Sequence, residues 1–361
     1  MSTELIAQII IIIAKLAIVI GVFMTILTWI SFIERRVVAV IQERIGPNRT
    51  GPFGLLQPLA DGLKLFMKED LIPDNAEPVT FTLAPMIVIF VSFLGVTVLP
   101  FGGTFELFGY EIKLVLLDVN IALLIPLALS SLAVYGIMIG GWSSNNKYSL
   151  LGGLRSSAQM ISYELALGLS LIPVIMWSGS LNLSEIVELQ GGPLWGIKQL
   201  GFINNWLVFN PLFWIPFLTF VCSGYAETNR LPFDLPEAET ELTGGFHTEY
   251  SSMKFAIFFM AEYTAMIVMS GLIVTFFLGG WYAPISILDF SSIPVIGVLA
   301  GPFWFLAKLC FFLFLYIWVR GTYPRLRYDQ LMAFGWKFLL PVTLGMVVII
   351  AIALVWFDWA T

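Results

Sequence analysis

Charged residues are scarce in this sequence of 361 residues, and the shortage restricts where the chain can fold. Only 12% of the residues are charged, whereas a soluble domain carries roughly 25%. The hydrophobic fraction is 58% and the mean hydropathy is +0.90. So few charges cannot cover a water-exposed surface, so we expect a protein that has the lipid bilayer as its partner. The formal charge of −6 contains no basic surplus, which argues against nucleic acid as a partner.

Histidine and cysteine are also scarce, which limits the redox chemistry of the chain. His247 is the only histidine, whereas a cytochrome b-type haem needs a pair. Cys222 and Cys310 lie far apart in apolar runs, match no metal-ligand spacing and are too few for an Fe–S cluster, which takes about four. No glycine-rich phosphate loop is present. We therefore expect no metal site and no bound cofactor, and any electrons must come from another subunit.

Eight stretches approach the length of about 20 apolar residues that a bilayer-spanning helix needs. They are Gln8–Phe32, Phe81–Leu99, Val119–Gly140, Ala158–Trp177, Pro211–Tyr225, Phe255–Leu278, Pro302–Val319 and Phe338–Phe357, of which the fifth is the shortest. This pattern predicts an all-α polytopic membrane protein with about eight transmembrane helices, forming a single transmembrane domain over residues 1–361.

Lysine and arginine are distributed asymmetrically among the connections. Of the 18 basic residues, 14 fall in the four odd-numbered connections, which are residues 34–78, 141–157, 226–254 and 320–337. By the positive-inside rule these are inner loops and both termini lie outside. We interpret the membrane as a bacterial inner membrane rather than a mitochondrial one.

The first inner loop carries a helical pattern of apolar residues. Leu55, Leu59, Leu63 and Phe66 recur at helical spacing, while Asp61 and two lysines lie elsewhere. The pattern predicts an amphipathic helix lying on the inner membrane face. Such a helix is either a simple interfacial anchor or one wall of a lateral entrance for a lipid-soluble substrate.

The third inner loop is rich in carboxylates. From Glu227 to Glu249 it carries six acidic residues against Arg230 alone, namely Glu227, Asp234, Glu237, Glu239, Glu241 and Glu249. Crowded carboxylates titrate as a coupled group, some with raised pKa values, and can store protons. On charge alone, a solvated acidic loop is the simpler interpretation.

Four ionisable residues lie inside the predicted spans, where they are functional candidates by default. Glu164 and Glu262 are interpreted as parts of a proton path, with a structural ion pair as the alternative. For Lys15, near the outer end, snorkelling to the interface is favoured. Lys308 fits either a functional or a structural role.

Several long segments resemble the H subunit of NADH-quinone oxidoreductase, respiratory complex I, in that family's order. They are Glu34–Arg36, Gly46–Pro52, Leu55–Asp61, Ala158–Glu164, Ala226–Asp234, Phe258–Tyr263 and Arg320–Leu331. The resemblance implies eight spans, and inner loops that dock the soluble arm and wall a chamber where quinone, the substrate, is reduced. FMN and Fe–S clusters would then belong to partner subunits of the complex.

The resemblance also assigns roles to particular residues. Six charged residues match positions that surround the chamber and its entrance in the family. They are Arg35, Arg36, Asp61, Arg230, Arg320 and Arg325. Seven acidic residues match the family's path for protons from the chamber into the membrane arm. They are Glu164, Glu227, Asp234, Glu237, Glu239, Glu241 and Glu262. His247 stands where many relatives carry Asn and receives no role, and the outer stretch Asn182–Asn210 matches the family poorly.

Three other interpretations remain. The membrane subunit of an energy-converting hydrogenase would look similar, and only its partner subunits would distinguish it. A secondary transporter would show internal repeats and interrupted helices in its two halves, which the sequence lacks. A purely structural anchor would leave the intramembrane glutamates unexplained.

Overall fold

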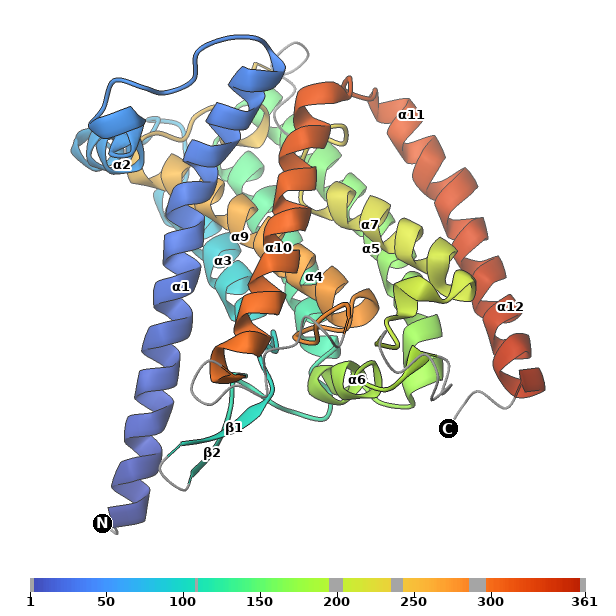
Figure 1. Ribbon diagram of the computed structural model, residues 1–361. Helices are drawn as coiled ribbons and strands as arrows, with labels where there is room; N and C mark the ends of the chain where they lie inside the picture. Colours follow the sequence, from blue (N-terminus) through green and yellow to red (C-terminus); the bar gives the residue numbers. More distant parts are fainter. Residues whose placement is uncertain (1–2, 108–109, 195–203, 235–242, 286–296, 358–361) are drawn as a thin grey trace.

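The computed structural model describes residues 3–107, 110–194, 204–234, 243–285 and 297–357, and most of these residues are helical (Figure 1). Within these ranges, seven helical stretches are long and apolar enough to cross a bilayer. They are α1 (Thr3–Ile41), α3 (Pro78–Val96), α4 (Leu124–Ser143), α5 (Lys147–Ser178), α9 (Ser252–Phe277), α10 (Gly297–Thr322) and the C-terminal stretch. That last stretch comprises α11 (Tyr328–Ala333), a π-helical turn (Phe334–Leu339) and α12 (Leu340–Phe357). The prediction of an all-α membrane protein is confirmed.

An eighth helix, α7 (Trp214–Glu227), is too short to be recognised as a span by its length. It has 14 residues, whereas a typical span needs about 20. Two 3₁₀ turns, Leu207–Phe209 and Pro211–Phe213, precede it. The first turns of α1 and the end of α12 lie at the same end of the molecule as α6 (Leu183–Leu189) (Figure 1). A chain with both ends on one side of a membrane must cross it an even number of times. The seven long stretches therefore reach the eight predicted spans only when α7 is included.

Two helices extend beyond the apolar stretches that predicted them. The N-terminal helix continues to Ile41, so Glu34 lies inside α1 and not in a loop. Helix α5 begins at Lys147, where the Asn146 Oδ1 atom accepts a hydrogen bond of 2.9 Å from the Tyr148 N–H. Residues 144–146 alone therefore connect α4 to α5, and most of the inner loop expected over 141–157 is helical. Hydropathy marks the lipid-facing length of a helix, whereas the capping hydrogen bond decides where it starts.

The helices pack closely through small residues. A Cβ atom added to Gly141 of α4 would lie 3.2 Å from the Gly153 Cα atom of α5. At Gly136 it would lie 2.3 Å from a methyl group of Val88 on α3. Burial of apolar surface drives little association between helices in lipid, so contacts of this kind carry much of the packing.

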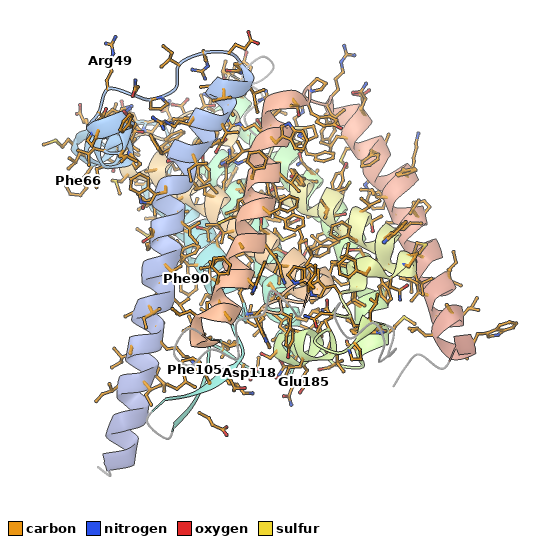
Figure 2. The ribbon with its side chains drawn as sticks, in the orientation of Figure 1. Arg49, Phe66, Phe90, Phe105, Asp118 and Glu185 are labelled. Atoms are coloured by element: carbon orange, nitrogen blue, oxygen red, sulfur yellow. The ribbon has the colours of Figure 1, made fainter. Side chains whose placement is uncertain are left out.

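At one end of the molecule lies a hairpin that the sequence did not predict, formed by β1 (Thr104–Leu107) and β2 (Tyr110–Lys113). Figure 2 shows Asp118 and Glu185 at this end, with Arg49 and Phe66 at the opposite end. Asp118 accepts hydrogen bonds from Lys113 (2.9 Å) and Asn182 (3.0 Å), which join the hairpin to the start of α6. Partial burial raises the pKa of the Asp118 carboxyl, but these hydrogen bonds outweigh it and hold the pKa below its usual value.

The predicted amphipathic helix is confirmed as α2 (Gln57–Met67), which lies beside the C-terminal half of α1 (Figure 1). Leu59 and Leu63 are each 62% exposed and Phe66 is 73% exposed. No residue of α2 is buried, so the apolar face of the helix is available to lipid.

Candidate functional site

The centre of the candidate site is Glu34, a buried carboxylate on α1. Its Oε1 atom forms an ion pair with Arg320 of α10 and lies 3.5 Å from Arg230 Nη1. Its Oε2 atom accepts a hydrogen bond of 2.7 Å from the hydroxyl of Tyr263 on α9. A buried carboxylate needs such partners because its desolvation costs several kcal/mol. Three helices and one loop therefore meet at Glu34.

Arg230 joins Glu34 to a second carboxylate. Its Nη2 atom lies 3.8 Å from Glu262 Oε2, and its guanidinium lies over the Tyr263 ring, 4.3 Å from the ring centre. Glu34, Arg230, Tyr263, Glu262 and Arg320 form what we call the central cluster. Within it two carboxylates face two guanidinium groups, so its charges balance.

The loop that follows α7 is folded into the protein over its described part. Glu227, Arg230 and Asp234 are all buried, and Asp234 Oδ2 accepts a hydrogen bond of 2.8 Å from Arg325. A solvated acidic loop is therefore the wrong interpretation for residues 227–234. Three more of the predicted proton-path residues, Glu237, Glu239 and Glu241, lie outside the described residues.

A cavity of about 490 Å³ opens between α1, α2 and α9. Its lining includes Arg35 and Asp61, which form an ion pair of 2.6 Å, and Gln57 donates a hydrogen bond of 3.0 Å to the same aspartate. Phe259 and Tyr263 line it from α9. We call this cavity the lateral opening. Tyr263 belongs both to its wall and to the central cluster.

Arg36, also predicted for the entrance, does not line this opening. Its Nη2 atom donates a hydrogen bond of 2.6 Å to the backbone carbonyl of Phe53, and its guanidinium lies over the ring of Phe32. The contacts of Arg36 thus attach the loop before α2 to the end of α1.

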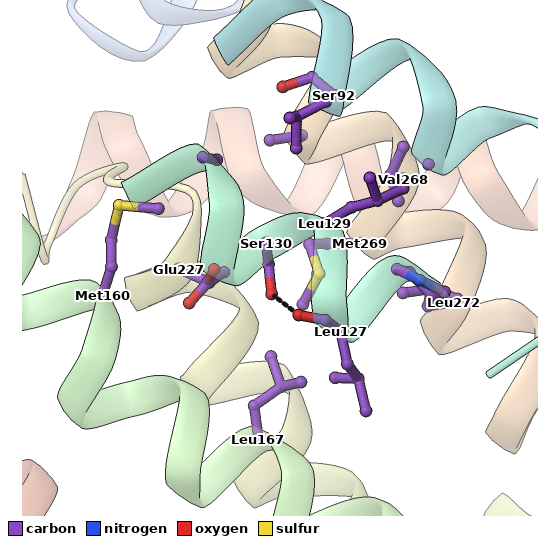
Figure 3. Close-up of a pocket in the computed structure, with 15 residues that line it drawn as sticks. Ser92, Leu127, Leu129, Ser130, Met160, Leu167, Glu227, Val268, Met269 and Leu272 are labelled. Carbon is purple, nitrogen blue, oxygen red and sulfur yellow. Dashed lines mark hydrogen bonds between the residues drawn. The ribbon is translucent and has the colours of Figure 1, made fainter. Parts of the chain in front are cut away.

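A second, smaller cavity of about 80 Å³ lies between α3, α4, α5, α7 and α9, and Glu227 and Ser130 both line it (Figure 3). Both carboxylate oxygens of Glu227 are buried, and neither has a hydrogen-bond partner among the described residues. The cavity is large enough for several water molecules, which buried polar groups of this kind bind.

Glu164 lies next to this cavity. Its Oε1 atom accepts hydrogen bonds from Ser131 and, at 3.4 Å, from Ser130. Glu164 and Glu227 are near enough to interact electrostatically. The structure therefore brings together two predicted proton-path residues through a serine pair that the sequence did not single out.

Lys308 has a structural environment. Its Nζ atom donates to the backbone carbonyls of Leu278 (2.6 Å), Gly280 (2.8 Å) and Tyr282 (2.7 Å) and lies over the ring of Trp206. An ammonium has three N–H donors, and all three are used in hydrogen bonds to backbone carbonyls. A backbone carbonyl does not titrate, so these contacts provide no proton-transfer partner. This geometry favours the structural interpretation of Lys308 over a functional one.

Two members of the central cluster were missing from the predicted site. Glu34 and Tyr263 both occur in the segments that carry the family resemblance, but neither had a predicted role. The available signal was an acidic residue directly before Arg35 and Arg36 at the end of an apolar stretch. Only the packing of α9 and α10 against α1 shows that this carboxylate is buried.

Comparison with known proteins agrees with this architecture. The family model for NADH dehydrogenase matches residues 14–351. The NADH-quinone oxidoreductase H subunit 2 of Koribacter versatilis is 50% identical over 348 residues, which cover 94% of this chain and 95% of that protein. The chain belongs to the family of NADH-quinone oxidoreductase H subunits.

Two other relatives show the same extent of similarity. The H subunit of Thermomicrobium roseum is 49% identical over 327 residues, and that of Rickettsia bellii is 49% identical over 330 residues. These matches cover 91% of this chain in both cases, and 91% and 89% of the relatives. As a member of this family, the chain is a multi-pass membrane subunit of an enzyme complex.

Proposed function

We propose that this membrane subunit walls the chamber in which a quinone is reduced, and that its buried carboxylates couple the reduction to proton translocation. The observation that carries the proposal is the position of Tyr263. Tyr263 lines the lateral opening, while its hydroxyl donates to Glu34 in the central cluster. A molecule inside the opening would therefore contact the same side chain that holds the buried charges.

The lateral opening suits an amphipathic substrate. Most of its lining is apolar, with contributions from Phe66 on α2 and Met260 on α9, and the Arg35–Asp61 ion pair provides a polar element. Ligand sites typically combine an apolar wall with a few placed polar groups in a volume of about 300–1,000 Å³. A quinone has an apolar tail and a polar head group, so it matches this combination.

Quinone reduction takes two electrons and two protons and gives quinol. The electrons would come from the terminal Fe–S cluster of a partner subunit, with FMN in another, since this chain is proposed to bind no cofactor of its own. Transient charge on the quinone acts strongly on nearby carboxylates where little water screens it. Glu262 and Glu34 are the carboxylates that the central cluster places next to the opening.

From the central cluster the proposed proton path continues to Glu227 and Glu164. Arg230 and Glu227 lie on the same buried segment, three residues apart. Water in the 80 Å³ cavity would connect Glu227 with Ser130, and Ser130 contacts Glu164. Asp234, paired with Arg325, would lie between the path and the docked soluble arm.

The topology completes the proposal. The basic end of the molecule, which carries α2 and the central cluster, would face the cytoplasm of a bacterium and dock the soluble subunits of the complex. Both termini would face outside. Neighbouring membrane subunits would receive the protons that leave Glu164.

A photoreactive quinone analogue tests this assignment in the purified complex. We expect light-induced labelling of peptides from α1, α2 and α9, reduced by excess quinone, in a complex that oxidises NADH. Labelling confined to other subunits would contradict the proposed chamber. A complex without NADH oxidation would favour a hydrogenase-type assembly.

A further inference from the structure

The position of α2 depends on polar attachments, because the helix buries no side chain of its own. On one side Asp61 pairs with Arg35 of α1. On the other side the C-terminal end of α2 meets the segment that leads into α9. Apolar packing therefore contributes little to holding this wall of the lateral opening.

Ser252 makes the attachment to α9. Its hydroxyl contacts the carbonyl oxygens of Leu65 (3.0 Å) and Lys68 (2.8 Å) at the end of α2. Helix C-terminal carbonyls have no partner within the helix and need one from outside. Ser252 is 4% exposed, so this contact is shielded from water.

The backbone at Ser252 has an unusual conformation. Its φ is +53°, in the left-handed region that non-glycine residues seldom adopt. Such a conformation costs about 1–3 kcal/mol and persists where the surrounding contacts hold it. The residue at the start of α9 is thus held in an unfavourable conformation while its hydroxyl contacts α2.

Two neighbouring residues reinforce the junction. Lys254 Nζ lies 2.9 Å from Asp70 Oδ2 and over the ring of Phe81 on α3. The Ser251 hydroxyl accepts a hydrogen bond of 3.1 Å from the Leu71 N–H. Residues 251–254 therefore tie the chain that leaves α2 to the first turn of α9.

The lateral opening lies on the same two elements. Its lining includes Gly62, Leu65 and Phe66 of α2, and Met253 and Phe255 of α9. Met253 directly follows Ser252, and Leu65 is one of the two residues whose carbonyl oxygens the Ser252 hydroxyl contacts. The junction thus sets the separation of the two walls.

We propose that Ser252 is a positioning residue that sets the width of the lateral opening and thereby the affinity for long-tailed quinones. This inference rests on the proposed function of the opening. The hydroxyl of Ser252 contacts α2 and not the central cluster. The chemistry at the quinone head group should therefore not depend on Ser252.

The experiment compares Ser252→Gly with wild type in the purified complex. Glycine removes the hydroxyl but tolerates the positive φ, so the fold is kept. We expect KM for a long-tailed quinone to change by about 2- to 10-fold, the equivalent of one hydrogen bond, with kcat for a short-tailed quinone unchanged. Hydrogen exchange of the last turn of α2 should increase. Thr82→Ala, which removes a hydroxyl bonded only within α3, is the matched control.

Gly62→Phe separates failure of this inference from failure of the proposed function. A Cβ at Gly62 meets no atom within 4 Å, so phenylalanine can extend into the opening. If Gly62→Phe changes KM and Ser252→Gly does not, the positioning role is overturned while the opening keeps its function. If neither variant changes KM, both are overturned. An equal fall of kcat for short- and long-tailed quinones in Ser252→Gly would also overturn the positioning role of Ser252.

Discussion

Tyr263 and Glu34 are 229 residues apart in the sequence, yet the tyrosine hydroxyl donates a hydrogen bond of 2.7 Å to the glutamate carboxylate. The contact joins α9 to α1 at the end of the molecule that carries α2. Through it, the wall of the lateral opening reaches the buried charges of the central cluster.

Glu34→Gln should destabilise the protein strongly. The change removes the buried carboxylate that pairs with Arg320 and with the buried Arg230, a loss of about 3–5 kcal/mol for a broken buried pair. Thermal unfolding of the purified complex measures this loss of stability. Asp61→Asn is the control, because Arg35 is 50% exposed and such a pair contributes at most about 1 kcal/mol. Equal effects of the two changes would show that the central cluster is not a structural centre.

Glu227→Gln should separate quinone reduction from proton translocation. The amide cannot take up or release a proton, while the shape of the side chain in its cavity is kept. We expect fewer protons translocated per NADH in reconstituted vesicles, with the oxidation rate largely preserved when the vesicles are uncoupled. The exposed Glu77, changed to Gln, serves as control. Undiminished translocation by Glu227→Gln would remove this residue from the path.

Lys308→Met should lower stability without altering proton translocation. The change leaves three backbone carbonyls without their donor, and each unsatisfied buried group costs about 1–3 kcal/mol. Lys15→Met, which removes a single contact to the Lys113 carbonyl, should have a much smaller effect on thermal unfolding. Normal stability of Lys308→Met combined with lost translocation would instead identify a proton relay.

Gly152→Ala and Gly168→Ala, both on α5, should have opposite effects. A Cβ at position 152 would lie 2.8 Å from the backbone of Gly245, whereas at position 168 it would meet no atom within 4 Å. Overpacking costs about 1–3 kcal/mol, while alanine in an open helix position gains about 0.5–1 kcal/mol. The thermal unfolding temperatures of the two variants, measured side by side, test the packing of α5 against the segment after the acidic loop.

The attachment of the hairpin should depend on pH through Asp118. Its pKa is lower in the folded protein than the usual 3.8, so its contribution is complete above that value and disappears as pH falls through the folded pKa. Hydrogen exchange of β1 and β2, corrected for the intrinsic effect of pH, should be faster in Asp118→Asn at neutral pH. The difference from wild type should vanish in acid. A difference that persists unchanged in acid would mean that charge on Asp118 does not hold the hairpin.

The apolar stretches alone determined the class of the protein and the approximate position of most helices. The amphipathic helix α2 also followed from local pattern, because the spacing of Leu59, Leu63 and Phe66 is a property of neighbouring residues. The short stretch Pro211–Tyr225 also predicted the position of α7, whereas the start of α5 depended on the cap at Asn146.

The sequence nominated three of the five residues of the central cluster but not their arrangement. Long motifs pointed to Arg230, Glu262 and Arg320 as candidates, while they could not show that Glu34 contacts Arg230 and Arg320. Composition decides that the chain enters lipid, since transfer of apolar residues is additive along a helix. The tertiary structure alone decides which charges are buried together, because electrostatic compensation depends on distances between helices that are far apart in the sequence.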